Sequence, residues 1–517
     1  MAVTADETQP LLRSKTNDSA GCPAPIAGQR YTEVNNTCID AGAASDAYLV
    51  DFDPNGDIDN PLEWPTTFKW GIVFLLALTA FTVTFTCIGV VPLALPIISD
   101  LTPPPSSGSD LSPPSKSSSV LLVTIWELGE AAGPLLIAPL SETYGRYPVI
   151  NAANILFILA TLMAVTAQSV PVFVTARAMT GLAVASNVLN PAIVGDMFVS
   201  EERGAAVSLV FLAPLIGGAL GPAIATAVAE RAGWRSVLWL SIGLASVCEV
   251  VFLTCFRETY KVAILRKRAR ELGGVKGGAV VEGDGGRGLK GLGEAVLRPA
   301  RVLMGSGVLL SMGAFGSVVF SYYYVMSTTL SEILGGIYGL DPVTVGFCFV
   351  SFSVGSTFSV FVCNRHLDKI YIKMRDANKG VGLPEFRLPL VIIGAVCMPI
   401  VTAFYGWSAQ LRLGVHCTLI SSALMGSSMT LALVPLTAYI VDAFGLYAAS
   451  ATTGIIVTRC LMSTFLPLLT GPLVDWYGYG WAFTVFAGLT MMLVPIPVLM
   501  LRYGAHWRRF SPYSRDQ

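Results

Sequence analysis

Twelve long apolar runs constrain the fold of this chain more than any other feature of its sequence. Each run has about 20 residues or more, which is the length a helix needs to cross a hydrocarbon core of roughly 30 Å. Because lipid offers the backbone no hydrogen-bond partners, each run must be helical. With 53% hydrophobic and 13% charged residues among 517, the sequence predicts an all-α polytopic membrane protein with twelve transmembrane helices. The runs are Phe68–Val91, Ser118–Leu140, Pro148–Gln168, Pro171–Gly195, Ala205–Ala229, Trp234–Phe256, Val302–Thr328, Pro342–Cys363, Leu388–Trp407, Leu413–Ile440, Leu446–Gly471 and Trp481–Leu501.

Basic residues are distributed unevenly between the loops that join these helices. Most Lys and Arg residues lie before the first run, in the loops that follow even-numbered runs, and in the last tail. The opposite side carries Lys116, Arg231, Arg235 and Arg412. Since cytoplasmic loops are enriched in Lys and Arg, we expect both termini in the cytoplasm. The first 60 residues are polar and lack the apolar core of a signal peptide, so the first run is expected to direct insertion.

The longest internal loop divides the runs into two sets of six. Its stretch GGVKGGAVVEGDGGRGLKGLG is rich in glycine and charge, which favours a flexible tether between two bundles. Two six-helix bundles with similar loops on one side are typical of transporters built from repeats. We expect a largely disordered cytoplasmic tail at 1–66, a first bundle at 67–256, a linker at 257–301, a second bundle at 302–502 and a cytoplasmic tail at 503–517.

Charge and cysteine content argue against several classes of function. The net charge of −1 gives no overall attraction to nucleic acid. The ten cysteines are scattered, without a Cys-x-x-Cys pair, so they predict neither a disulfide framework nor a metal site. A phosphate-binding G-x-x-x-x-G-K-[ST] motif does not occur. We therefore expect no cofactor, no metal and no nucleic-acid partner.

Ionisable residues inside the apolar runs are the strongest functional signal, because charge at this depth is costly. Glu127 and Glu130 are three residues apart and share one face of a helix. Burial favours the protonated carboxyl and a nearby guanidinium favours the ionised one, so Glu127 and Glu130 with Arg177 could bind and release a proton. The alternative is a static buried pair that fixes helix packing. For Arg459, the other basic residue deep in a run, we expect either a role in gating or a structural link to the second run.

The turn PLSETYGRYP after the second run combines glycine with charged residues. Gly145 permits a tight turn. Glu142, Arg146, Asp196 and Glu201 could form a charge cluster that holds one conformation closed and breaks when the bundles move. This arrangement predicts a gate, and the alternative is an ordinary solvated loop.

Seven stretches occur in order along the chain: NPLEWP (Asn60–Pro65), APLSETYGRYPV (Ala138–Val149), ARAMTGLAVA (Ala176–Ala185), DMFVSEERGAA (Asp196–Ala206), APLIGGALGPAIAT (Ala213–Thr226), LPEFRLP (Leu383–Pro389) and YIVDAFGLYAASATTGIIVTRCLMSTFLPLL (Tyr439–Leu469). They resemble motifs of the major facilitator superfamily and, within it, of the fungal twelve-span drug:proton antiporters. The resemblance covers most of the chain from about Asn60 onward.

The resemblance implies the major facilitator fold, with its two six-helix bundles, and a transporter instead of an enzyme. It further implies export of a drug, toxin or secondary metabolite in exchange for protons by alternating access. In the antiporter motif of span 5, Pro214, Gly217, Gly221 and Pro222 form a smooth, bendable surface that another helix can approach closely. The paired glycines that usually close this motif are replaced here by Ala225-Thr226.

In this superfamily, spans 1, 4, 7 and 10 line the central cavity. This chain has Asn187 in span 4 and Tyr323 and Tyr324 in span 7, and we expect these residues to bind substrate. Aromatic surfaces with a few polar groups fit a moderately hydrophobic organic molecule. The alternative is that these rings serve as packing or interface anchors.

Two other functions remain open, namely proton-coupled uptake of a nutrient and a non-transporting membrane sensor of the same fold. The span 5 motif favours export over uptake, and the buried charges argue against a sensor. We expect a monomer whose partners are protons, a small organic substrate and the lipid bilayer. The plasma membrane is the first expectation for its location, with the vacuole or another internal membrane as the alternative. The stretch ETQPLL (Glu7–Leu12) matches an acidic dileucine sorting pattern, which also occurs by chance in polar tails.

Overall fold

The computed structural model describes residues 48–49, 51–53, 56–102, 116–273, 279–280 and 289–514. The chain forms two units, Met1–Ala47 and Tyr48–Gln517, and all described residues belong to the second. The dileucine pattern Glu7–Leu12 and most of the glycine-rich stretch of the linker lie outside the described residues.

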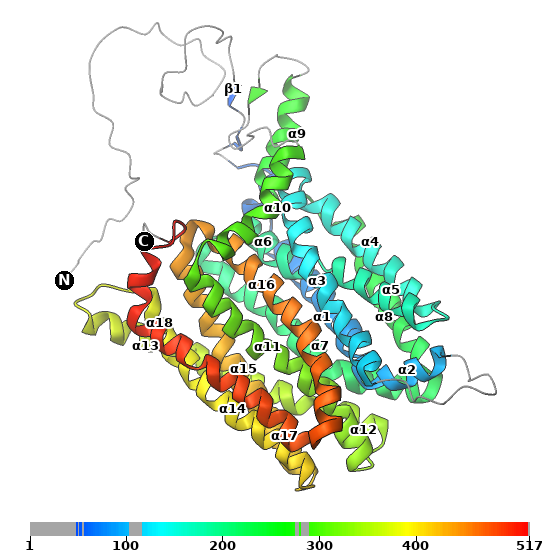
Figure 1. Ribbon diagram of the computed structural model, residues 1–517. Helices are drawn as coiled ribbons and strands as arrows, with labels where there is room; N and C mark the ends of the chain where they lie inside the picture. Colours follow the sequence, from blue (N-terminus) through cyan, green and yellow to red (C-terminus); the bar gives the residue numbers. More distant parts are fainter. Residues whose placement is uncertain are drawn as a thin grey trace, which may run out of the picture. The chain divides into compact units, whose positions relative to one another are not determined.

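The described chain is built almost entirely of helices (Figure 1). The N-terminal half, Thr66–Cys255, follows a short 3-10 helix, η1 (Pro61–Glu63). Its elements are α1 (Thr66–Ile88), η2 (Val91–Leu93), α2 (Ala94–Leu101), α3 (Lys116–Tyr144), α4 (Arg146–Val165), α5 (Val170–Leu182), α6 (Ser186–Met197), α7 (Ser200–Ala232) and α8 (Trp234–Cys255).

The linker carries α9 (Lys261–Gly273) and α10 (Leu289–Met304), and a two-residue parallel pair joins β1 (Tyr48–Leu49) to β2 (Ala279–Val280). The C-terminal half, Gly307–Arg508, follows α10 directly. Its elements are α11 (Gly307–Glu332), the π-helix η3 (Ile333–Ile337), α12 (Pro342–Cys348), α13 (Val350–Ala377), η4 (Pro384–Arg387), α14 (Leu388–Gln410), α15 (Val415–Phe444), η5 (Gly445–Tyr447), α16 (Ala448–Phe465), η6 (Leu466–Leu469), α17 (Thr470–Leu493) and α18 (Pro495–Arg508).

Ten helical segments of the described chain are long and apolar enough to cross a membrane. One of them, Ala448–Arg508, bends at Gly478, where φ is +78°, and it contains nearly all of the eleventh predicted run and all of the twelfth. The fourth run is divided into α5 and α6 by non-helical residues at 183–185. The prediction of a twelve-helix membrane fold is confirmed, but the expectation of an unbroken fourth helix is wrong. The break is tolerated because Ala183, Val184 and Ala185 are buried in protein instead of facing lipid.

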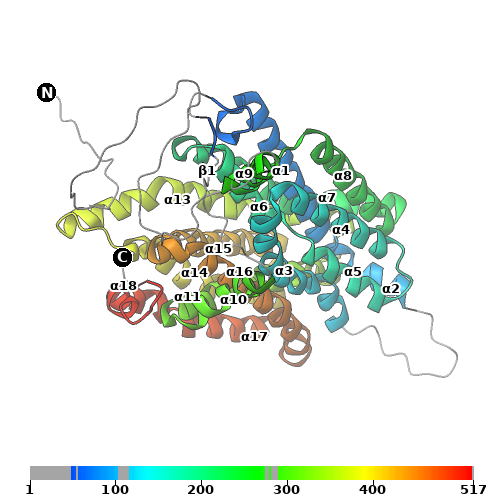
Figure 2. The ribbon, with the colours of Figure 1, turned by 90° about the horizontal axis from the view of Figure 1, so that it is seen from above.

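The membrane helices run between two ends of the structure. We call the end that carries α9 and α10 the linker end, and the end that carries α2 and α12 the far end (Figure 1). Seen from above, the helices of the two halves lie on opposite sides, with α3 and α16 next to each other between them (Figure 2). The halves also meet where α7 packs against α12 and α13.

The buried apolar core is shared at one end and divided at the other. One cluster extends from the middle of the helices to the far end and contains residues of both halves, such as Val91 and Leu93 with Leu330 and Val345. The two other large clusters are each confined to one half. Closure between the halves therefore depends mainly on apolar contacts at the far end.

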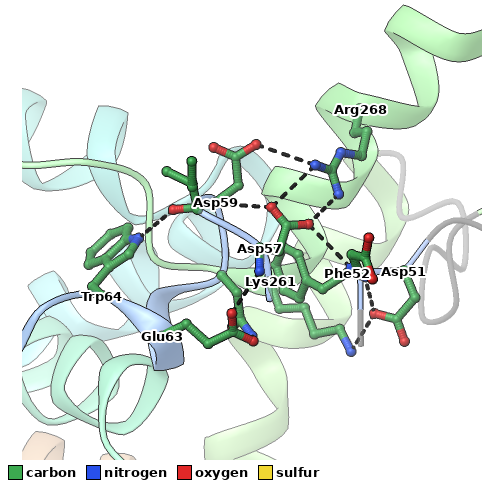
Figure 3. A network of polar contacts seen from close by, with 11 residues as sticks. Asp51, Phe52, Asp57, Asp59, Glu63, Trp64, Lys261 and Arg268 are labelled. Atoms are coloured by element: carbon green, nitrogen blue, oxygen red, sulfur yellow. Dashed lines mark hydrogen bonds and ion pairs between the residues drawn. The ribbon is translucent and has the colours of Figure 1, made fainter. Parts of the chain in front are cut away.

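The segment that precedes α1 binds the first linker helix through a set of ion pairs that we call the clasp, formed by Asp51, Asp57, Asp59, Lys261 and Arg268 (Figure 3). The Arg268 guanidinium lies 2.6 Å from Asp57 Oδ2 and 3.6 Å from Asp59 Oδ2, and Lys261 Nζ lies 2.9 Å from Asp51 Oδ1.

Apolar and backbone contacts support the clasp. Phe52 packs against Leu265 and Ala269 of α9. The Trp64 indole donates to the Ile58 carbonyl over 3.0 Å, which folds the acidic segment back on itself. Acidic and basic segments far apart in sequence thus attract each other and hold the first helix of the linker. The glycine-rich stretch that is predicted to act as a tether begins only where this helix ends.

We expect Arg268→Ala to loosen the clasp by about 1 kcal/mol, the scale of a well-formed, partly exposed ion pair. Amides of residues 56–64 should then exchange hydrogen roughly fivefold faster at neutral pH. Lys267→Ala is the matched control, because Lys267 is exposed on the same helix. Equal exchange in both variants would exclude a stabilising role for Arg268.

The clasp should also respond to pH. The hydrogen bond from Arg268 holds the pKa of Asp57 below its usual value, so its contribution is present above the unfolded-state pKa of about 3.9. It is lost as the pH falls through the lower folded-state pKa. Exchange protection of residues 56–64, corrected for intrinsic rates, should be equal at pH 7 and pH 5 and decline only below about pH 4. A decline between pH 7 and pH 5 would contradict this assignment.

Candidate functional site

The carboxylate of Glu127 lies where the two halves meet. Glu127 is on α3 and is only 2% exposed. Its Oε1 accepts a 2.6 Å hydrogen bond from Tyr324 Oη on α11, which belongs to the other half. Its Oε2 is buried and has no hydrogen-bond partner among the described residues. One oxygen of this carboxylate is thus held by the C-terminal half, while the other remains able to take up a proton.

Glu130, one turn further along α3, also contacts the C-terminal half. Its Oε1 lies 3.8 Å from Arg459 Nη2 on α16, and its Oε2 accepts a 3.2 Å hydrogen bond from the Trp126 indole. The Arg459 guanidinium in turn lies over the Phe320 ring, 4.1 Å from its centroid. The structure therefore brings together Glu127, Glu130 and Arg459 from the predicted site.

Arg177, by contrast, does not contact either carboxylate in the described structure. It is 1% exposed, and its two terminal nitrogens donate 3.0 Å hydrogen bonds to the carbonyls of Thr86 and Cys87 near the end of α1. Its guanidinium lies 4.7 Å from the centroid of the Trp126 ring. This arrangement differs from the expected pairing of Arg177 with Glu127 or Glu130. The Trp126 ring lies against the guanidinium in place of a carboxylate, and the free carbonyls at the end of α1 bind its terminal nitrogens.

Close approach of backbones explains how α3 and α5 can hold these groups. A Cβ added to Gly129 would lie 2.0 Å from the Ala178 carbonyl oxygen, and one added to Gly181 would lie 2.1 Å from the Trp126 carbonyl oxygen. No side chain fits at either position. The two helices therefore touch at glycine, and this contact fixes Trp126 and Glu130 relative to Arg177.

The residues expected to bind substrate are only partly described. The Asn187 side chain lies outside the described part of the chain. Tyr324 is buried against Glu127, whereas Tyr323 is half-buried and its ring lies 4.9 Å from that of Phe352. A Cβ added to Gly218 of α7 would lie 3.7 Å from Tyr323 Oη, so Tyr323 also lies near the opposite half. A substrate contact at Tyr323 remains a prediction.

The turn between α3 and α4 is built around Gly145 and Arg146. Gly145 has φ +100°, a region that favours glycine. Arg146 Nε lies 3.3 Å from Asp196 Oδ2, its Nη1 donates to Ser141 Oγ, and its guanidinium lies 4.8 Å from the centroid of the Tyr260 ring. The predicted contact between Arg146 and Asp196 is thus present.

Glu258 holds this turn in place and was missed by the sequence analysis. Its carboxylate accepts hydrogen bonds from the backbone N–H groups of Arg146, Tyr147, Thr259 and Tyr260, at 2.8 to 3.1 Å. It thereby caps the start of α4 and the residues that lead into α9 with one side chain. An acidic residue directly before a basic helix, in FRETYK, was the available signal.

The Arg146 contacts all belong to the N-terminal half and the start of the linker, so in the described structure this turn does not join the two halves. Glu142 is exposed on the surface, and the Glu201 side chain lies outside the described residues. A gating role for Glu142, Gly145, Arg146 and Asp196 stays a prediction.

The C-terminal half repeats the arrangement with different residues. Arg387, at the start of α14, forms an ion pair with Asp442 near the end of α15. The sequence FRLP at 386–389 corresponds to GRYP at 145–148, and DAF at 442–444 corresponds to DMF at 196–198. Beside this pair, the buried Glu385 accepts two hydrogen bonds from Arg508, at 2.8 and 3.1 Å. Sequence reasoning missed Glu385 and Arg508, although the internal repeat of R-x-P and D-x-F was visible.

The span 5 motif has two faces. Toward the same half, a Cβ on Gly217 would lie 3.0 Å from the Phe81 carbonyl oxygen, and Gly221 lies against Phe85. Toward the other half, a Cβ on Gly346 of α12 would lie 2.7 Å from the Pro222 carbonyl oxygen and 2.2 Å from Thr226 Oγ1. The end of α7 and the start of α12 are thus in direct contact at the far end. Pro214 lies inside α7, one of its two internal prolines.

Residues 73–465 match the family model described as Major Facilitator Superfamily. Among curated proteins, the efflux pump radE of Floropilus chiversii is 29% identical over 470 residues, which cover 90% of this chain and 85% of that protein. The MFS transporter cpaT of Aspergillus oryzae is 30% identical over 474 residues, which cover 90% of this chain and 92% of that protein.

Solved structures share the fold at low sequence identity. A D-xylose-proton symporter superposes with a TM-score of 0.61 at 16% identity, over 88% of this chain and 100% of that one. The human organic anion transporter MFSD10 (TETRAN) gives a TM-score of 0.56 at 16% identity, over 84% of this chain and 100% of that one.

We expect Arg177→Lys to destabilise the protein more than it alters transport chemistry, since an ammonium cannot bond both carbonyls and stack on Trp126 as a planar guanidinium does. The loss of one charged hydrogen bond should cost about 2 kcal/mol and lower the melting temperature of detergent-solubilised protein. Arg231→Lys, at an exposed site on α7, is the matched control. If Arg177→Lys melted with the control, the guanidinium would not be supporting the end of α1.

Proposed function

Because the chain belongs to the major facilitator superfamily, and is therefore an integral membrane transporter and not an enzyme, we propose that it exports a small organic molecule in exchange for protons. The proposed substrates are drugs, toxins or secondary metabolites. The name of one fungal relative supports this direction, since radE of Floropilus chiversii is an efflux pump. The proposed mechanism is alternating access between the two bundles at 67–256 and 302–502, joined by the linker at 257–301.

The observation that carries proton coupling is the contact between Glu127 and Tyr324. It exists only while α3 and α11 lie together, so a movement of the halves that separates these helices must change the surroundings of this carboxylate. With Tyr324 donating to one oxygen, the ionised form is stabilised. When that contact breaks, an isolated buried carboxylate becomes costly and takes up a proton. Glu127 thereby couples protonation to the arrangement of the halves.

Glu130 and Arg459 act as the partner charges in this proposal. Their 3.8 Å separation is long for a direct ion pair, so small movements of α16 change it strongly. Since the two glutamates lie one turn apart on α3, the charge state of one affects the other. Arg177 takes a positioning role here, because it holds the end of α1 near this pair.

Alternating access requires that the far end open and close. The contact of Gly346 with Pro222 and Thr226, together with the apolar cluster that the two halves share, supports the far end as the closed gate. In the proposed orientation the linker end faces the cytoplasm and the far end faces outward, and we propose that both termini are cytoplasmic. We propose that the protein is a monomer in the plasma membrane. Its proposed partners are protons and a moderately hydrophobic organic substrate, which binds near Tyr323.

Glu127→Gln should keep the hydrogen bond from Tyr324 but remove the titratable group, because the amide is almost equal in size. Transport driven by an imposed pH gradient in proteoliposomes should fall by roughly tenfold or more, equivalent to about 1.4 kcal/mol, while the melting temperature changes little. Glu230→Gln, at an exposed position on α7, controls for loss of a carboxylate. If Glu127→Gln transported at the rate of the control variant with the same pH dependence, Glu127 would have no role in proton coupling. If the wild type were instead stimulated by a pH gradient of the opposite sign, the protein would be a proton-coupled uptake transporter.

Gly346→Ala tests the far-end gate. The added methyl group would meet the Thr226 hydroxyl and the Pro222 carbonyl, so the halves should separate there and turnover should fall. In a background without the exposed native cysteines, a cysteine introduced at the buried Val345 should react several-fold faster with an impermeant maleimide. Gly335→Ala, where nothing lies within 4 Å of the added carbon, should leave the labelling rate unchanged. Equal labelling in both variants would exclude this contact as a gate.

A further inference from the structure

A second buried carboxylate, Glu249, lies inside the N-terminal half and away from the meeting point of the two halves. Glu249 is on α8 and is 4% exposed. Its Oε2 accepts a 2.8 Å hydrogen bond from Asn154 Nδ2 on α4. Its Oε1 is buried without a hydrogen-bond partner among the described residues. Unlike Glu130, it takes part in none of the ion pairs of the described chain.

The charged residues on the helices that pack against α8 are too far along their helices to compensate Glu249. The helices with the most contacts to α8 are α1, α4 and α7. Their charged residues lie in first or last turns: Lys69, Arg146, Glu201, Glu202, Arg203, Glu230 and Arg231. Helix α5 also touches the start of α8, through the rings of Phe173 and Trp234, but its Arg177 is bound to the carbonyls of Thr86 and Cys87. Lys69, for example, is ten residues or about 15 Å of helix rise from Thr79, which lines the cavity beside Cys248 of α8. The neighbouring titratable group on α8 itself is Cys248.

A small cavity adjoins this carboxylate through Asn154, and apolar groups make up the larger part of its lining. Its polar lining consists of Thr79, Thr82, Asn154 and Cys248. Its apolar lining consists of Val83, Phe157, Ala183, Ala185 and Ala245, two of which lie at the break between α5 and α6. About 20 Å³ of it is open to the centre of a water molecule, and roughly 10–15 Å³ is enough to hold one water. The two threonine hydroxyls donate to carbonyls of their own helix, so their oxygens can still accept a bond from that water.

The break in span 4 and the buried acid are therefore parts of one site. Non-helical backbone inside a membrane protein persists where it lines a hydrated cavity or is covered by protein. A carboxylate with one amide donor and no cation pays a desolvation cost of several kcal/mol when ionised. The protonated acid avoids that cost, and its carbonyl can still accept the hydrogen bond from Asn154.

We propose that Glu249 and Asn154 form a proton-binding site within the N-terminal half, in which Glu249 is held as a neutral carboxylic acid beside a cavity that holds water. The carboxylate takes a proton from a hydronium ion in the cavity and gives the carboxylic acid and water. In the reverse step the acid transfers its proton to a cavity water and gives the carboxylate and a hydronium ion. This site is separate from Glu127 and Glu130, and it stands whether or not those residues couple transport to protons.

Infrared difference spectroscopy of the full-length protein in lipid tests the proposal directly. In a Glu127→Gln/Glu130→Gln background, a carboxylic acid C=O band should be present at neutral pH and disappear when Glu249→Gln is added. Glu230→Gln, at an exposed site, should leave the band intact. Asn154→Leu should shift the band, because it removes the hydrogen bond to the acid carbonyl, and a merely structural role for Asn154 would not move it. If adding Glu249→Gln removed no acid band, Glu249 would be ionised and the proposal overturned.

Thermal melting gives a second readout that does not depend on the spectrum. Glutamine is close in shape to the neutral acid, so Glu249→Gln should melt with the wild type near pH 4, where the carboxyl group is protonated in both the folded and the unfolded chain. It should melt above the wild type at pH 7, because the unfolded wild type is stabilised by releasing this proton once the pH exceeds its unfolded pKa of about 4.3. A Glu249→Gln protein that is less stable than the wild type at both values would indicate a compensated carboxylate and contradict the proposal. If Glu249→Gln did not fold, the band shift in Asn154→Leu would still show whether Glu249 is a neutral acid or an ionised carboxylate.

Discussion

Charge that lipid cannot solvate determines where the helices of this protein touch. Each buried ionisable side chain must find its partner within the protein, because the bilayer offers none. Glu127 finds Tyr324, Glu130 finds Arg459, and Arg177 finds the free carbonyls at the end of α1. Two of these three solutions join opposite halves. In the proposed mechanism, a change in the protonation of Glu127 or Glu130 would therefore change the contacts that α3 makes with α11 and α16.

At the linker end, the two halves share one type of ion pair, and each half adds a second carboxylate that binds different groups. The pair of Arg146 with Asp196 recurs as Arg387 with Asp442, each linking the start of one helix to the end of another. The additional carboxylate differs, since Glu258 caps backbone N–H groups whereas Glu385 binds Arg508. The internal repeat thus keeps the Arg–Asp ion pair in both halves, while the contacts that surround the pair differ.

The sequence predicted the membrane class, the twelve helices and the contact of Arg146 with Asp196, because apolar length and local motifs determine them. It placed Glu127 and Glu130 on one face correctly, since three-residue spacing fixes that geometry. It could not predict the partner of Arg177, which depends on the indole of Trp126 occupying the space between helices. The break at residues 183–185 was hidden for a similar reason, because an apolar sequence has the same appearance whether its backbone is helical or lines a cavity.

The clasp between the segment before α1 and helix α9 has a consequence for biosynthesis. All of its members lie between Asp51 and Arg268, so every partner has left the ribosome before the first helix of the C-terminal half is made. The first six membrane helices can therefore be tied at their linker end while the rest of the chain is still being translated. The C-terminal half then inserts beside an N-terminal half that is already assembled. The side chains of Glu127 and Glu130 on α3 are in place when α11 and α16 pack against them.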